Sequence, residues 1–165
     1  MERKTGKIKE TPNDYDFRKK TSELINLVEN EIIVTTGEFS IYYYPDVRQA
    51  FRDAWHKGVP IKAYLGKCDE DTVYRVVSDG IAVYQGNNVE PKEHFMVVDN
   101  KHWIKSESHE PCATGKRHGP YAKNDPEEAS KKRALFDSLI KGINPINVPI
   151  RNTQRAKQFL AELYK

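Results

Sequence analysis

The chain has 165 residues, of which 31% are charged and 38% are hydrophobic, and this is the composition of one globular domain. Lysine and arginine (27) outnumber aspartate and glutamate (24), and the net charge of +3 permits nucleic-acid or anion binding without arguing for either. The two cysteines form no disulfide framework, the charged N-terminus is no signal peptide, and no apolar run reaches the ~20 residues of a membrane span, so we expect a soluble cytoplasmic protein.

Helical and strand patterns alternate through the first half of the chain. Residues 1–13 are polar and predict a flexible arm ahead of an α/β domain over residues 14–145. The elements expected next are a helix from Asp16 to about Glu31, a strand over 32–36, a helix from Pro45 to Gly58, a strand over 60–65, a helix from Asp71 to Gly80 and a strand over 81–84. This order is typical of right-handed crossovers in a parallel sheet.

The aromatic segment 39–44 lies between the first expected strand and the next helix, and the sequence gives it no single assignment. It follows the end of that strand, where ligands collect in open parallel sheets, and Glu38 offers a carboxylate at the same place. Its tyrosines suit base stacking, a subunit contact or packing in the core.

The pattern changes after residue 88. Two short apolar runs flank the turn residues Asp99 and Asn100, which predicts a β-hairpin that buries Phe95, Val97 and Trp103. We expect a long loop over residues 107–124, a helix that begins with Asp125 as N-cap and ends at Gly142, and a C-terminal helical tail over 146–165. That tail docks on its own domain, on a second copy or on a partner.

The segment from Lys92 to Lys101, K-E-H-F-M-V-V-D-N-K, resembles the signature hairpin of the phospholipase D-like superfamily. The family motif is H-x-K followed by four residues and an aspartate, at the end of a hydrophobic strand. The order of elements from Asp16 to Ile140 is also similar to one half of that fold. The resemblance therefore implies an α/β fold with a mixed sheet flanked by helices, a β-hairpin and terminal helices, and a second half from a homodimer or a partner domain.

Two alignments of the motif are open. In the first, Lys92 stands for the family histidine, His94 for the lysine and Asp99 for the aspartate. In the second, His94 is the histidine, Met96 stands for the lysine and Lys101 for the aspartate. Neither alignment supplies all three groups. Downstream, Ser106-Glu107-Ser108 stands where family members carry G-S-x-N.

The family chemistry that the resemblance implies is attack of an imidazole on phosphorus to form a phosphohistidine. A second histidine protonates the leaving group, the lysine neutralises phosphoryl oxygens and the aspartate orients the imidazole. The catalytic candidates in this chain are His94 and Asp99. Candidates for holding phosphate are Lys92, Lys101, Ser106, Ser108, Lys116 and Arg117, the last two from a basic loop with His118 and Gly119.

A metal site is an alternative use of the same region, because imidazole and thiolate are good zinc ligands. Its candidates are His102, His109, Cys112 and His118. The paired C-x-x-C spacing of structural zinc sites is missing from the sequence, and we expect no cofactor.

Three functions follow from these observations. The first, which we favour, is a non-catalytic domain that binds a phosphate-containing ligand or nucleic acid at a dimer cleft, because the catalytic set is incomplete. The second is a divergent phosphodiesterase or nuclease that uses His94. The third is a structural or regulatory dimerisation module.

Overall fold

The structure is a computed structural model that describes residues 7–86, 90–107 and 117–146. Its strands are β1 (Lys9–Thr11), β2 (Ile32–Thr36), β3 (Ile61–Leu65), β4 (Ala82–Tyr84), β5 (His94–Val98), β6 (His102–Ser106) and β7 (Gly119–Ala122). Its helices are α1 (Asp14–Asn26), the 3-10 helix η1 (Ser40–Tyr43), α2 (Pro45–His56), α3 (Glu70–Ser78) and α4 (Pro126–Ile140). The tail predicted over 146–165 lies, from residue 147 on, outside the described residues.

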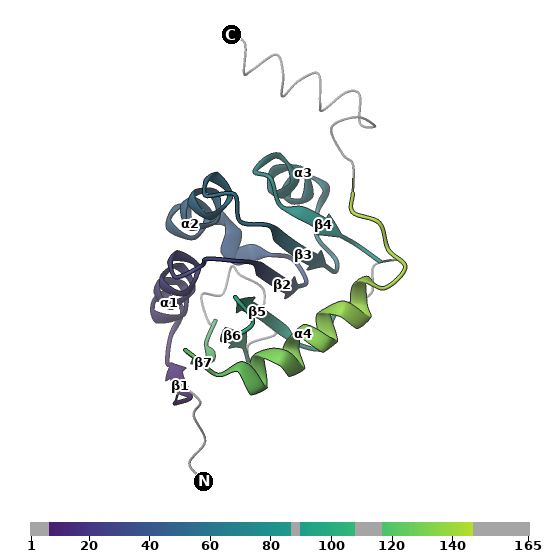
Figure 1. Cartoon of the computed structure of the whole chain (residues 1–165). Helices are drawn as coiled ribbons and strands as arrows, with labels where there is room; N and C mark the ends of the chain where they lie inside the picture. The colour runs from purple at the N-terminus through teal and green to yellow at the C-terminus, as the bar shows by residue number, and fades with distance from the viewer. Residues whose placement is uncertain (1–6, 87–89, 108–116, 147–165) are drawn as a thin grey trace.

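The strands form one seven-stranded sheet with the order β1-β7-β6-β5-β2-β3-β4 in the described part of the chain. Helices α1, α2 and α3 cover one face of this sheet and α4 covers the other (Figure 1). Strands β2, β3 and β4 are parallel, while β5, β6, β7 and β1 pair antiparallel. The α/β class with a mixed sheet flanked by helices is confirmed. The described helices include none that is both long and apolar enough to cross a membrane.

The predicted hairpin is present as β5 and β6. Asp99 and Asn100 form its turn with φ angles of 56° and 55°, the left-handed backbone that Asp and Asn adopt more readily than most residues. Side chains alternate along β5, because successive strand residues point to opposite faces. Met96 and Val98 therefore join the core under α1 and α2, whereas Phe95 and Val97 join the core under α4.

Two strands occupy stretches for which the sequence predicted an arm and a loop. β1 lies inside the expected arm and pairs with β7, which lies inside the expected loop. Gly119 is the reason β7 can approach β6, since a Cβ at this position would collide with the carbonyl oxygen of Lys105. The Thr11 hydroxyl donates to the Gly119 carbonyl (2.7 Å) and accepts from the Gly119 N–H (3.0 Å). Glycine and proline in so short a strand conceal it from a pattern search.

Two helix ends differ from the sequence expectation. Helix α1 ends at Asn26, several residues before Glu31, and the residues that follow turn toward Asp99. Asp125 occupies the N-cap position of α4, but its side chain makes no capping hydrogen bond. Its carboxylate is buried and accepts from the Trp103 indole N–H at 3.1 Å. A tertiary contact therefore replaces the local one.

A buried cation anchors α4 to the sheet. The Lys132 side chain is 4% exposed, its ammonium donates to Glu128 Oε1 at 3.0 Å, and it lies 4.4 Å from the centre of the Trp103 ring. The aliphatic stem supplies apolar contact, and the charge needs its carboxylate partner because desolvation disfavours an unpaired ion.

We predict that Glu128→Gln lowers the free energy of unfolding by about 1–2 kcal/mol, because it leaves the buried ammonium without a charged partner, and the partial exposure of Glu128 limits the loss. Lys132→Met, which keeps the stem and removes the charge, changes it by less than about 1 kcal/mol. Urea unfolding of both variants measures the difference. An equal or larger loss for Lys132→Met contradicts the assignment.

Candidate functional site

Three neighbouring inner strands carry polar side chains at the same end of the sheet. His94 begins β5 and pairs with Ser106, the last residue of β6. Thr36 ends β2 and follows Thr35, which pairs with Phe95 of β5. Directly opposed strand residues point to the same face, so Thr36, His94 and Ser106 form a rim row on the face covered by α1 and α2.

A cavity of about 160 Å³ opens at this row. Its more exposed polar lining comes from the rim row together with Glu38, Ser40, Glu90 and Arg117. Its buried lining is mostly apolar and includes Phe17, Val34, Phe39, Phe51, Met96 and Ile104, together with the buried threonines Thr21 and Thr35. The cavity lies at the carboxyl end of β2, where a ligand site with the Glu38 carboxylate was one of the alternatives that the sequence left open.

Arg117 supplies the positive charge of the cavity lining that the structure describes. Its side chain is 10% exposed, donates from Nη1 to Asp14 Oδ1 at 2.8 Å, and donates from Nη2 to the Ser40 hydroxyl at 2.9 Å. The guanidinium also lies 5.6 Å from the centre of the Tyr44 ring. These contacts fix its orientation, and they engage two of the five N–H donors of an arginine.

Two carboxylates lie at the mouth of the cavity. Glu38 and Glu90 are both exposed, so solvent screens their charges more than that of Arg117. Glu90 accepts from the backbone N–H of Lys67 and lies against Gly37 and Gly66, whose missing side chains make room for it. The Arg117 side of the cavity is therefore more favourable for negative charge than the side of the two carboxylates.

The fold is similar to solved structures that carry the phospholipase D name. Nuc from Salmonella typhimurium, a phospholipase D family member, matches with a TM-score of 0.68 and 14% identity, over 86% of this chain and 97% of Nuc. NucT from Helicobacter pylori matches with a TM-score of 0.66 and 9% identity, over 85% and 100% of the two chains. The chain has the phospholipase D-like fold. This confirms the fold that the resemblance implies.

A third similar structure is TrmBL2, an archaeal chromatin protein with a novel mode of DNA binding. It matches with a TM-score of 0.60 and 13% identity, over 88% of this chain and 57% of TrmBL2. No protein-family model matches the sequence, and no curated protein matches it. The likeness is therefore one of backbone architecture.

Within the phospholipase D-like fold, the cavity contains the second motif alignment only in part. His94 lies in the rim row, and Met96 lies two residues deeper on the same face, at the position of the family lysine. Lys92 is exposed, precedes β5 and does not line the cavity. The structure thus brings together His94, Ser106 and Arg117.

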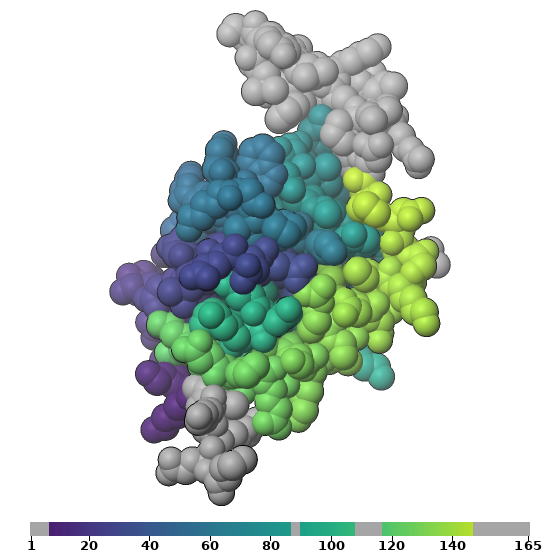
Figure 2. Space-filling view, viewed as in Figure 1, coloured from purple at the N-terminus to yellow at the C-terminus, as the bar shows by residue number. Residues whose placement is uncertain are grey.

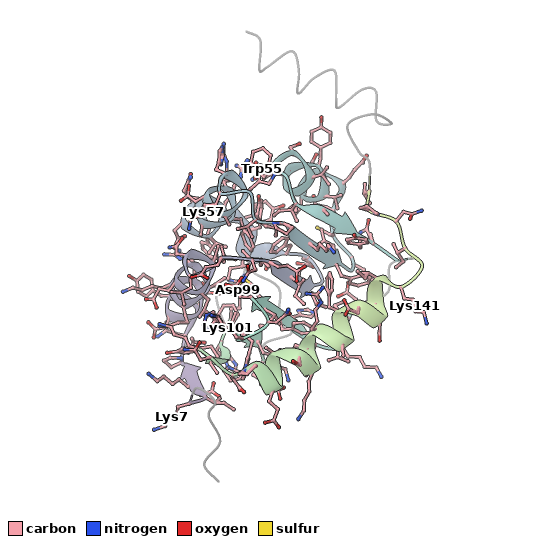
Figure 3. The ribbon with its side chains drawn as sticks, viewed as in Figure 1. Lys7, Trp55, Lys57, Asp99, Lys101 and Lys141 are labelled. Atoms are coloured by element: carbon pink, nitrogen blue, oxygen red, sulfur yellow. The ribbon has the colours of Figure 1, made fainter. Side chains whose placement is uncertain are left out.

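Asp99 and Lys101 lie at the opposite end of the hairpin. Asp99 is five residues from His94 along the chain, which corresponds to about 17 Å of extended strand. Figure 3 shows Asp99 and Lys101 at the β5–β6 turn. Figure 2 shows this turn at the surface, between α1 and α4. Lys101 is exposed there.

The Asp99 carboxylate holds the loop between α1 and β2. Its oxygens accept from the backbone N–H groups of Glu29 (2.9 Å), Asn30 (2.7 Å) and Glu31 (3.0 Å). Three N–H groups converging on one carboxylate form an anion-binding turn. This contact sets the entry of the chain into β2, and it gives Asp99 a structural task far from the cavity.

The histidines proposed as alternative metal ligands lie apart from the cavity where they are described. His102 is buried at the start of β6, and its Nδ1 accepts from the Asn124 N–H at 3.0 Å. His118 is exposed just before β7. No cluster of three or more His, Cys, Asp and Glu side chains is found in the described ranges. Ser108, His109, Cys112 and Lys116 lie outside them.

Several lining residues were missed by the sequence analysis. Thr36 and Ser40 had a usable signal, because Thr36 is the last residue of a predicted strand and Ser40 follows shortly after it. Glu90 had none, since its place depends on the packing of a loop against two glycines distant in sequence.

We predict that Asp99→Ala lowers the free energy of unfolding by about 1–2 kcal/mol, because three N–H groups lose a charged acceptor and two of them are reached by water. The matched variant Lys101→Ala, in the same turn but exposed, changes it by no more than about 0.5 kcal/mol. Chemical denaturation measures both. Equal stability of the two variants contradicts the structural role of Asp99.

Burial lowers the pKa of His102, because the interior disfavours the imidazolium. The unfolded chain then binds a proton at higher pH than the native chain, so stability is full above about pH 6.5 and declines as the pH falls toward the lowered value. We predict that His102→Gln flattens this decline and that His56→Gln, exposed on α2, does not. Thermal melts of the unaltered protein and the two variants at pH 7.5 and 5.5 test this prediction. An equal decline of stability in all three proteins contradicts it.

Proposed function

We propose that the cavity binds the phosphate group of an anionic ligand and does not cleave it. The observation that carries the proposal is the nearly buried guanidinium of Arg117 in the same cavity as His94 and Ser106. A guanidinium recognises phosphate through paired N–H donors, and imidazole and hydroxyl groups complete such a site. Phosphate seated there would share the guanidinium with the Asp14 carboxylate.

The absence of cleavage rests on what stands at the motif positions. Met96 replaces the lysine with an uncharged thioether, which cannot neutralise phosphoryl oxygens in a transition state. The Asp99 carboxylate lies about 17 Å along the strand from His94 and binds three backbone N–H groups, so it does not orient this imidazole. Lys92 stands outside the cavity and supplies no nucleophile.

Nucleic acid is one carrier of such a phosphate, and the DNA-binding chromatin protein with a similar backbone supports it. A second copy of the chain, or a partner domain, would complete a cleft around the cavity, as the resemblance implies. Sedimentation of the protein without ligand, at several protein concentrations, tests for the dimer. A monomer at every concentration rules the dimer out.

Binding is tested by calorimetry with inorganic phosphate and with a short single-stranded oligonucleotide. We predict that Arg117→Gln weakens phosphate binding about 10- to 100-fold, the effect of losing one charge-assisted contact. Arg52→Gln, which removes the same charge from the exposed face of α2, leaves it within about twofold. Equal losses for the two variants, or no binding by the unaltered chain, overturn the proposal.

The phosphodiesterase alternative is separated by activity. We predict that single- and double-stranded DNA remain intact with and without chelator, because the lysine and aspartate of the motif are missing from the cavity. Cleavage that disappears in His94→Ala would instead establish the divergent enzyme, since the imidazole at the rim is its nucleophile.

A further inference from the structure

An apolar layer lies directly beneath the rim row. Val34, Met96 and Ile104 are partners in the ladder of β2, β5 and β6, and each lies two residues inward from a rim residue. They share the face of the rim row and are 5%, 4% and 2% exposed. This floor row therefore lies about 7 Å deeper along the strands than the rim row.

Aromatic side chains form the wall above the floor row. Phe17 comes from α1, Phe39 precedes η1 and Phe51 comes from α2, and all three line the cavity. The Phe39 and Phe51 rings meet edge to face with centres 5.8 Å apart. Phe39 has a φ of 52°, a left-handed conformation that is unusual for a bulky residue and persists only where the surroundings enforce it. The surroundings thus hold Phe39 in place at the cavity, in contact with Phe51.

The chemistry of the floor row and the size of the cavity suit a ligand with one small flat ring. The whole cavity, rim row included, has a volume of about 160 Å³, close to that of an engineered apolar cavity of ~150 Å³ that binds benzene. The thioether of Met96 makes favourable contacts with aromatic rings. The floor row carries no nitrogen or oxygen in its side chains to pair with the polar edge of a nucleobase, which would lose its hydrogen bonds to water there.

We propose that the cavity is a site for an aryl phosphate, with the phosphate at the rim row and Arg117 and a single phenyl ring on the floor row. This inference rests on the proposed function and adds the class of ligand to it. The spacing of the two rows is close to the length of phenyl phosphate. Met96, which removes the charge of the family lysine, at the same time makes the floor suitable for the ring.

The preference is measured as a ratio of affinities for the whole chain. Calorimetry or NMR titration compares phenyl phosphate with methyl phosphate, which share the anion and differ in the ring. We expect phenyl phosphate to bind about 10- to 100-fold tighter, because the ring is removed from water. Cytidine monophosphate, whose ring has a polar edge, binds no tighter than methyl phosphate.

Two variants separate the ring site from the phosphate site. Val34→Phe fills the floor and reduces the phenyl-to-methyl ratio to about one, while methyl phosphate affinity stays within about threefold. Met96→Lys, a second floor variant should Val34→Phe not fold, lowers the ratio and preserves or raises methyl phosphate affinity. Arg117→Gln weakens the binding of both ligands and leaves the phenyl-to-methyl ratio unchanged. Leu27→Phe adds a ring at an exposed position just after α1, and it changes neither the affinity for methyl phosphate nor the phenyl-to-methyl ratio.

The outcomes are distinct. Binding of both phosphates with a ratio near one overturns the aryl site and leaves the proposed function standing. No binding of either phosphate overturns both. Tighter binding of cytidine monophosphate than of phenyl phosphate overturns the aryl site in favour of a nucleotide, and a ratio unchanged in both floor variants shows that the ring binds elsewhere.

Discussion

The hydrogen-bond register of β2, β5 and β6 determines the chemistry of this molecule. It places Thr36, His94 and Ser106 in one row and Val34, Met96 and Ile104 in the row beneath. A slip of one residue in β5 would exchange its two faces, carrying His94 to the side of α4 and Phe95 into the cavity. The register is held by two different cores, one on each face, so a slip would bury the wrong side chains twice.

Charge at the site comes from a different part of the chain than in the motif that the hairpin resembles. Strand β5 contributes the imidazole of His94 and the thioether of Met96, while the positive charge is that of Arg117, which lies just before β7. Arg117 can remain nearly buried because Asp14 and Ser40 meet it, and desolvation would otherwise disfavour it. In the function proposed above, this fixed charge holds an anion and takes no part in phosphoryl transfer.

The sequence predicted the elements that follow local rules. The crossovers through β2, β3 and β4, the hairpin with its Asp99-Asn100 turn, and the burial of Phe95, Val97 and Trp103 all follow from periodicity and turn chemistry. It did not predict what depends on distant partners. Strand β7 exists because Gly119 admits a close neighbour, α1 ends early beside the Asp99 carboxylate, and Asp125 binds Trp103 instead of its own helix. The lining of the cavity needed the same knowledge for Glu90, which reaches it from a loop, whereas Arg117 was among the predicted phosphate-binding residues.

The pairing of β1 with β7 has a consequence for any N-terminal truncation of the protein. Removing the residues before α1 would take away the Thr11 hydroxyl and its two bonds to Gly119, and would leave β7 as the outer strand of the sheet. An uncovered strand edge invites another chain to pair with it. Arg117 lies two residues from that edge, so a shortened protein risks both self-association and a displaced guanidinium.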